Sequence, residues 1–322
     1  MRLFLLLLAV TFAGAAAAQQ NYPTRPMRIV IPWPPGQATD LMGRITAQQL
    51  SAQLGQQIVP DNRPGAGGMI GTDVAAKSTP DGYTLLAASS GPVSINPLLQ
   101  KAPYDPPRDL APVANVVLSK YLLVTHPKVP VKNVTELIAY AKANPGKLRF
   151  ATSGAGATAH LITEYFNGRA GIQALHVPYK GSAPAMIDLI GGQVEYAVET
   201  VAATWPHVKA GRLRAHGVTA SKPSPLAPGI EPLATAANMP GFDMAAWIGI
   251  MVPAKTPKAI IDRLAAGIEK AIASSEMQTQ LSTAGLEPEY IGPADFANYL
   301  KATRERYLDV IKKNNIRIEG ST

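Results

Sequence analysis

Two short loops, each followed by the predicted start of a helix, are the parts of this sequence best suited to bind a small anion. In the first, an apolar and β-branched run at 28–31 predicts a buried strand, and a Pro-Pro-Gly turn at 34–36 ends it. Thr39 and Asp40 are candidate N-caps, and a helical pattern follows to Leu54.

The first turn of a helix suits an anion because its backbone N–H groups have no partners and the helix dipole places partial positive charge there. A carboxylate or a phosphate is the expected ligand. An ordinary strand-to-helix turn without a ligand is the alternative, and Trp33 either forms an apolar wall or fills a hinge. The candidate residues are Trp33, Pro35, Gly36, Gln37, Ala38, Thr39 and Asp40.

The same pattern recurs in the second half of the chain. Residues 148–151 predict a strand, 152–156 form a loop with two glycines, and a helix is predicted from Ala157 to about Asn167. Two such helix starts, one in each of two domains, could hold both ends of a dianion. The candidates here are Thr152, Ser153, Gly156, Ala157 and Thr158.

Two serines follow a third predicted strand at 83–88. Because ligands of open α/β sheets bind outside the carboxyl ends of the strands, Ser89 and Ser90 are candidate hydrogen-bond donors in a cleft. A structural role in a turn is the alternative. His160 and Glu164 have a possible metal-ligand spacing, but two residues do not make a site, and we expect them to pack. We therefore expect no metal and no cofactor.

The first 18 residues predict an export signal. Arg2 precedes an apolar run at 3–12, and small residues at 16–18 suit cleavage near Ala18. An uncleaved anchor is the alternative. We expect a mature protein in the bacterial periplasm, because no later segment of the sequence is apolar over a membrane-spanning length.

Composition excludes several classes of function. The sequence has no cysteine, which rules out disulfides, thiolate metal sites and a cysteine nucleophile. Without Arg2, 29 basic and 22 acidic residues leave a net charge of +7. The basic residues are scattered, so we expect no nucleic-acid partner, although a diffuse positive field favours collecting small anions.

Alternating strands and helices predict an α/β fold in a chain long enough, at 322 residues, for two domains. An apolar segment around 113–125 predicts a strand that leaves the first domain, and 246–252 predicts the return crossing. The expected limits are 1–18 for the signal, 22–121 with 246–322 for domain 1, and 122–245 for domain 2. The late helices, the last at about 295–313, have no glycine loop and are interpreted as packing elements.

Several motifs occur together in a fixed order. They are Pro-Pro-Gly at 34–36, Asn-Arg-Pro-Gly-Ala-Gly-Gly at 62–68, Pro-Asp-Gly-Tyr-Thr-Leu at 80–85, Ser-Gly-Ala-Gly at 153–156, Val-Pro-Tyr-Lys-Gly at 177–181 and Lys-Ala-Gly-Arg-Leu-Arg at 209–214. With this set, the chain resembles the Bug family, the substrate-binding proteins of tripartite tricarboxylate transporters.

The resemblance implies a type II periplasmic-binding-protein fold, in which two domains close on a ligand like a Venus flytrap and two strands cross between them. It implies no catalysis and a small carboxylate ligand: a di- or tricarboxylate, an aromatic acid or an acidic amino acid. It also implies that 33–40 binds one carboxylate, that 152–158 faces the other end, and that Glu199, with Thr200 beside it, lines the cleft. Membrane transporter subunits are the implied partners of a monomer.

Three residues depart from the family pattern. Gln37 stands where a second glycine is usual, Ala157 where serine is usual, and Glu199 where aspartate is common. Glu199 either meets a ligand amine or pairs with an arginine. The other functions left open are an exported hydrolase, for which no nucleophile motif is present, and a sensor that presents the solute to a signalling protein.

Overall fold

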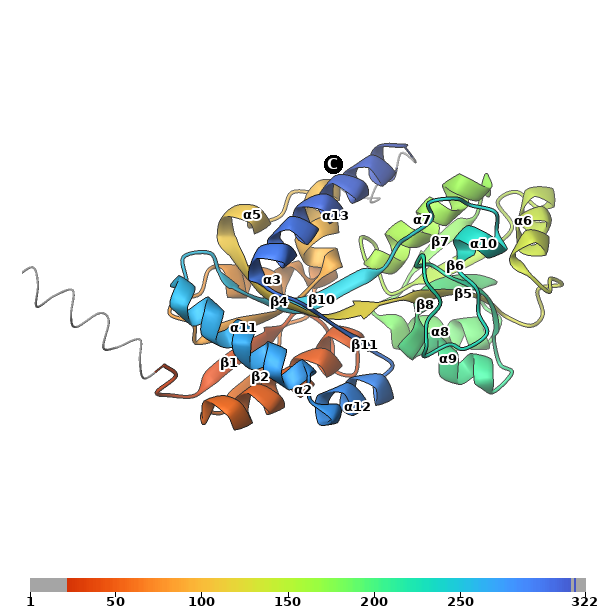
Figure 1. The fold of residues 1–322 in the computed structure, drawn as a ribbon. Coiled ribbons are helices and arrows are strands. Elements are labelled where there is room, and N and C mark those ends of the chain that lie inside the picture. Colours follow the sequence, from red (N-terminus) through yellow and green to blue (C-terminus); the bar gives the residue numbers. More distant parts are fainter. Residues whose placement is uncertain (1–21, 314–315, 317–322) are drawn as a thin grey trace, which may run out of the picture.

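The computed structural model describes residues 22–313 and 316, and it forms two lobes (Figure 1). Each lobe is built on one sheet. The strand order is β11-β4-β10-β3-β1-β2 in the six-stranded sheet and β7-β6-β8-β5-β9 in the five-stranded sheet. The strands are β1 (Met27–Ile31), β2 (Ile58–Asn62), β3 (Thr84–Ser89), β4 (Leu110–Ser119), β5 (Tyr121–Thr125), β6 (Arg149–Thr152), β7 (Leu175–Pro178), β8 (Tyr196–Thr200), β9 (Arg214–Val218), β10 (Ala246–Pro253) and β11 (Glu287–Ile291).

Helices cover both sheets, and the predicted signal at 1–18 lies outside the described residues. No helix within 22–313 is long and apolar enough to cross a membrane. The helices are α2 (Ala38–Leu54), α3 (Met69–Ala76), α4 (Asn96–Leu99), α5 (Pro106–Asp109), α6 (Val134–Ala143), α7 (Thr158–Ala170), α8 (Ser182–Ile190), α9 (Val201–Lys209), α10 (Leu233–Ala236), α11 (Lys258–Ile272), α12 (Ser275–Thr283) and α13 (Pro293–Lys313), with short turns η1 (Ala66–Gly68) and η2 (Gly91–Ile95).

The first sheet contains the parallel unit expected from the sequence. β1 pairs in parallel with both β2 and β3, and Ile29, Val30 and Ile31 are fully buried. β10 then pairs antiparallel with β3 and β4, so the sheet is mixed. β11 was not predicted, because its sequence Glu-Pro-Glu-Tyr-Ile has no apolar alternation and it forms only an irregular edge strand.

The chain crosses between the lobes on two adjacent strands. Only Lys120 separates Ser119, the last residue of β4, from Tyr121, the first of β5. The return crossing starts at Ala246 of β10, which pairs directly with Ser119. The two crossings, predicted separately from apolar runs, therefore form one antiparallel ribbon (Figure 1).

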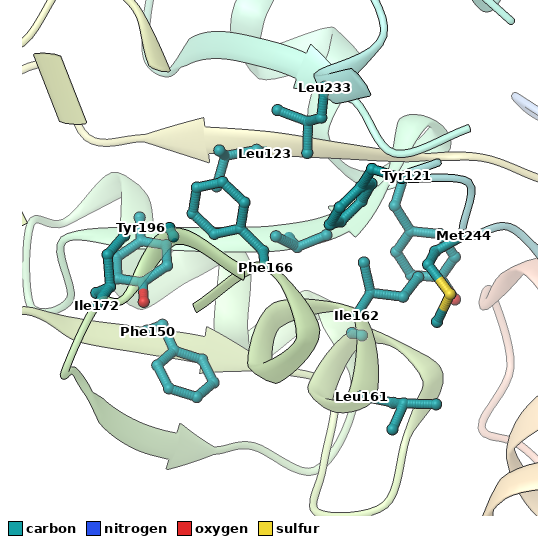
Figure 2. Packing of buried hydrophobic residues seen from close by; sticks show 14 of the residues in the cluster. Tyr121, Leu123, Phe150, Leu161, Ile162, Phe166, Ile172, Tyr196, Leu233 and Met244 are labelled. Atoms are coloured by element: carbon teal, nitrogen blue, oxygen red, sulfur yellow. The ribbon is translucent and has the colours of Figure 1, made fainter. Parts of the chain in front are cut away.

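One of the two apolar cores of the second lobe lies between its sheet and α7. Phe150, Phe166 and Tyr196 are almost completely buried, and they come from β6, α7 and β8. Figure 2 shows Phe166 pointing from α7 toward Leu123 of β5. This packing fixes where α7 begins, and α7 begins at one of the two predicted anion loops.

Helix α13 belongs to the cores of both lobes. Near its start, Phe296 packs on Trp247 in the first lobe, with ring centroids 5.2 Å apart. Near its end, Val310 and Ile311 are buried in the same apolar cluster as Phe166 of the second lobe. The predicted packing role for this helix is consistent with that burial, but its reach into the second lobe could not be read from the sequence.

The start of α2 differs from the expectation. Thr39 and Asp40 were candidate N-caps, whereas the helix begins at Ala38 and Gln37 occupies the N-cap position. Among the described side chains, none caps this end. The apolar stripe that suggested a later start reflects only the buried face of the helix.

Candidate functional site

A cavity of about 60 Å³ lies between the lobes, beside the crossing strands. Residues of both predicted loops contribute to its wall. The lining residues are Trp33, Gln37, Ala38, Thr39, Ser89, Ser119, Tyr121, Ser153, Ala157, Thr158, Ser182, Glu199, Thr200, Ala246 and Ile248.

The first lobe contributes the β1–α2 loop. The indole Nε1 of Trp33 donates a hydrogen bond to Ser89 Oγ at 2.9 Å, which fixes the ring as part of the cavity wall. Gln37, Ala38 and Thr39 then bring the uncapped start of α2 to the same cavity. The loop therefore offers an indole face, a side-chain amide and a helix N-terminus.

Asp40 supports this loop from behind and does not line the cavity. Its side chain is 2% exposed. The carboxylate accepts hydrogen bonds from the backbone N–H of Gly36 at 2.9 Å, from Arg44 Nε at 2.9 Å and from Asn62 Nδ2 at 2.8 Å. Asp40 reaches back from the first helical turn to the backbone N–H of Gly36, the residue before the N-cap, so its position is explained by its role in holding the loop.

The second lobe contributes the β6–α7 loop. Ser153, Ala157 and Thr158 line the cavity, and the start of α7 also lacks a side-chain cap among the described residues. Thr152 and Gly156 lie behind them. Thr152 Oγ1 lies 2.7 Å from His176 Nε2, and the Gly156 N–H donates to His160 Nδ1 at 3.3 Å.

Glu199 and Thr200 are the last residues of β8, not residues that follow the strand. Glu199 is 1% exposed. Its Oε1 accepts a hydrogen bond from the Thr200 N–H at 2.8 Å, while Oε2 has no partner among the described residues. Burial raises the pKa of this carboxyl group, and the Thr200 N–H and the hydroxyls of Ser182 and Ser153 lower it by less.

Glu199 forms no ion pair with any described arginine, so the arginine alternative drawn from the sequence is wrong. The hydroxyl of Thr200 accepts a hydrogen bond from the Ala203 N–H at 3.3 Å and caps α9. Across the part of the chain that the structure describes, the cavity wall holds no lysine, arginine or histidine.

Besides Asp40, Thr152 and Gly156, three more predicted residues lie outside the cavity. Ser90 is fully buried, and its Oγ bonds to the backbone of Trp247, which fits the structural alternative. Pro35 and Gly36 line a larger outer hollow of about 820 Å³. Gln37, Ala38, Ser182 and Thr200 line both spaces, so the cavity and this hollow are neighbours.

The outer hollow is largely apolar. Leu41 and two prolines contribute from the first lobe, and Met186, Ile187 and Ile190 from the second. Ile187 is 68% exposed, more than the other large apolar side chains that stand out at the described surface.

The sequence did not point to five of the lining residues: Ser119, Tyr121, Ser182, Ala246 and Ile248. Four of them belong to the crossing ribbon. Ser182 opens α8 directly after Gly181, whose φ of +115° favours glycine. That Gly-Ser start is a third loop-to-helix junction, and it could have been recognised by the rule used for the other two.

Two buried histidines, His160 and His216, and the half-buried His176 lie near the cavity. The rings of His160 and His176 stack with centroids 4.1 Å apart. Burial, followed by the neighbouring His176, lowers the pKa of His160 to about 3, and burial lowers the pKa of His176 to about 4. Burial, followed by Arg214, lowers the pKa of His216 to about 4.

The free energy of unfolding should therefore fall as the pH drops from about 6.5 to 4. In this window the unfolded chain, with histidine pKa values near 6.5, binds protons that the folded chain excludes. Each histidine contributes up to about 1.4 kcal/mol per pH unit. Urea unfolding at several pH values measures the slope. It should flatten in the variant H160Q/H176Q, and an unchanged slope in this double variant would contradict the assignment.

Two lobes on a double crossing, with helix starts from both lobes lining one cavity, define a two-lobed solute-binding protein. Residues 42–316 match the family described as "Tripartite tricarboxylate transporter family receptor". The chain belongs to this family, whose members are periplasmic binding proteins.

Individual relatives agree with this assignment. The chain is 37% identical to Protein BugT of Bordetella pertussis over 314 residues, which are 96% of each protein. Its fold matches the structure of Rpa4515 of R. palustris with adipate, with a TM-score of 0.87 and 34% identity over 92% of this chain and 99% of that one. It also matches MatC of Rhodopseudomonas palustris with bound malate, with a TM-score of 0.83 and 28% identity over 90% and 100%.

Proposed function

We propose that this protein is a periplasmic receptor that binds a small carboxylate between its lobes and delivers it to a tripartite tricarboxylate-type membrane transporter. The observation that supports this most directly is that the uncapped starts of α2 and α7, from different lobes, line one cavity. Backbone N–H groups at such starts stabilise a carboxylate without a cationic side chain. Adipate and malate, bound by the structural relatives, define the first ligands to test.

We also propose that the protein is exported and that residues 1–18 are removed. The mature protein acts as a monomer, and the subunits of the membrane transporter are its partners. The proposal also includes the domain limits 22–121 with 246–322 and 122–245. Closure would occur about the crossing ribbon, where Ser119 pairs with Ala246. The proposed ligand-contacting residues are those predicted residues that line the cavity: Trp33, Gln37, Ala38, Thr39, Ser89, Ser153, Ala157, Thr158, Glu199 and Thr200.

Carboxylate binding should stabilise the chain spanning 19–322. A ligand at a hundredfold excess over its dissociation constant adds about 2.7 kcal/mol to the free energy of unfolding. Urea unfolding with adipate, malate, aromatic acids or aspartate measures this gain, and the matching alcohols and amides serve as controls. If no carboxylate shifts the unfolding curve, the receptor proposal fails, and turnover of esters or amides would favour the hydrolase.

A further inference from the structure

The cavity combines an acidic side chain with a wall that holds no described cation. Its titratable lining residues are Glu199 and Tyr121. If Glu199 were ionised, a ligand carboxylate would enter a small, largely buried space that already carries a like charge. A receptor for carboxylates therefore needs either a neutral Glu199 or a cationic group on the ligand.

The partnerless Oε2 of Glu199 and its burial favour the neutral form, and they outweigh the Thr200 N–H and the hydroxyls of Ser182 and Ser153, which favour the ionised one. Oε1 accepts from the Thr200 N–H, whereas Oε2 is buried and has no partner among the described atoms. An ionised Oε2 can only accept hydrogen bonds, and the acceptor oxygens of a carboxylate ligand could not satisfy it. A protonated Oε2 is a donor, and a donor is what a ligand carboxylate requires.

The groups around Glu199 do not supply a compensating positive charge. Tyr121 on β5 faces it, and burial followed by the charge of Glu199 raises the pKa of that phenol. The carboxylates, histidines and cations on the neighbouring elements do not line the cavity. They are Arg149 on β6, His176 on β7, His160, Glu164 and Arg169 on α7, Asp188 on α8, His207 and Lys209 on α9, and Asp40 and Arg44 on α2 across the cleft.

We propose that Glu199 binds the ligand as a neutral carboxylic acid, with Oε2–H donating a hydrogen bond to a ligand carboxylate oxygen. This inference rests on the proposed function and narrows the ligand class. The receptor would select acids without an amine, because an ammonium group would meet no ionised partner in the cavity. Malate is then preferred over aspartate, which has the same carbon skeleton with an amine in place of the hydroxyl.

Burial already raises the pKa of Glu199 in the unliganded protein. A bound carboxylate beside it raises that pKa further, so ligand binding and proton retention favour each other. As the pH rises through the pKa of Glu199 in the unliganded protein, Glu199 ionises and the affinity for the carboxylate ligand falls. Above that value the loss approaches tenfold per pH unit.

Isothermal titration with adipate at about pH 7 compares the wild type with E199Q, whose amide keeps a neutral donor of the same shape. The matched control is E195Q, which removes a carboxylate on the same segment that pairs with Arg149 outside the cavity. We expect neither variant to bind adipate tenfold or more weakly than the wild type. We also expect the infrared spectrum of the wild-type complex to contain a protonated-carboxyl band that E199Q lacks and E195Q retains.

Three results would overturn the inference while leaving the receptor function intact. They are a loss of tenfold or more in the adipate affinity of E199Q, the absence of the infrared band, or a wild-type affinity that rises with pH. Tighter binding of aspartate than of malate would also overturn it, in favour of an ionised Glu199 and a ligand ammonium. If the wild type binds no carboxylate at any pH, the proposed function and this inference fail together.

Discussion

Replacing Gly249 by alanine is expected to lower the free energy of unfolding by about 3 kcal/mol. A Cβ atom at this position would lie 2.4 Å from the carbonyl oxygen of Ala114 and 3.0 Å from the Cα of Asn115. Both atoms belong to the backbone of β4, which is held between β10 and β11 and cannot move away alone. Urea unfolding followed by circular dichroism at about pH 7 measures the effect.

The matched control for this substitution is G292A. A Cβ atom at Gly292 meets only the side chain of Tyr290, at 3.4 Å or more, so its effect should stay within about 0.5 kcal/mol. If G249A is as stable as G292A, then β4 and β10 separate more easily than their pairing indicates. Because β4 and β10 connect the two lobes, that result would also argue against closure about a ribbon whose strands keep one fixed pairing.

Asp40→Ala is expected to cost about 3 kcal/mol in stability and at least tenfold in carboxylate affinity. The substitution leaves three donors, on Gly36, Arg44 and Asn62, without the buried carboxylate that they share. The affinity falls because these bonds hold the loop that leads to the uncapped start of α2. Urea unfolding and calorimetric titration with adipate measure the two effects.

Asp262→Ala is the comparison for Asp40→Ala. Asp262 also pairs with a cation one helical turn away, Lys258, but both side chains are exposed, and the pair is worth at most about 1 kcal/mol. Equal stabilities of the two variants would show that burial adds nothing at Asp40. A large loss of stability with unchanged adipate affinity would place the ligand away from the β1–α2 loop.

Local sequence signals predicted most of what is local in this structure. The Pro-Pro-Gly and Gly-Ala-Gly loops do lead from strands into helices, and both helix starts line the cavity. The side chain of Asn133 caps the start of α6, since the Glu136 N–H donates to Asn133 Oδ1 at 2.8 Å. In each case, residues within a few positions of one another determine the conformation.

The remaining features depend on contacts between distant segments. Ser119, Tyr121 and Ala246 line the cavity because two strands more than a hundred residues apart pair side by side, and no short pattern encodes that register. The sequence predicts Asp40 as a ligand residue because it does not reveal the partner Asn62, which comes from the next strand. In the structure, Asn62 donates a hydrogen bond to the Asp40 carboxylate. The neutral state inferred for Glu199 depends on burial, which only the folded chain provides.

The double attachment of α13 restricts how the lobes can move. Phe296 anchors the helix to one core, and Val310 and Ile311 anchor it to the other, on the same chain that twice crosses between the sheets. A wide opening would pull one end of this helix out of apolar packing, whereas a twist about the helix axis would leave both ends seated. We therefore expect the solute to enter and leave through a small rotation of one lobe relative to the other. Helix α13 stays packed against both lobes during this motion and limits how far they can move apart.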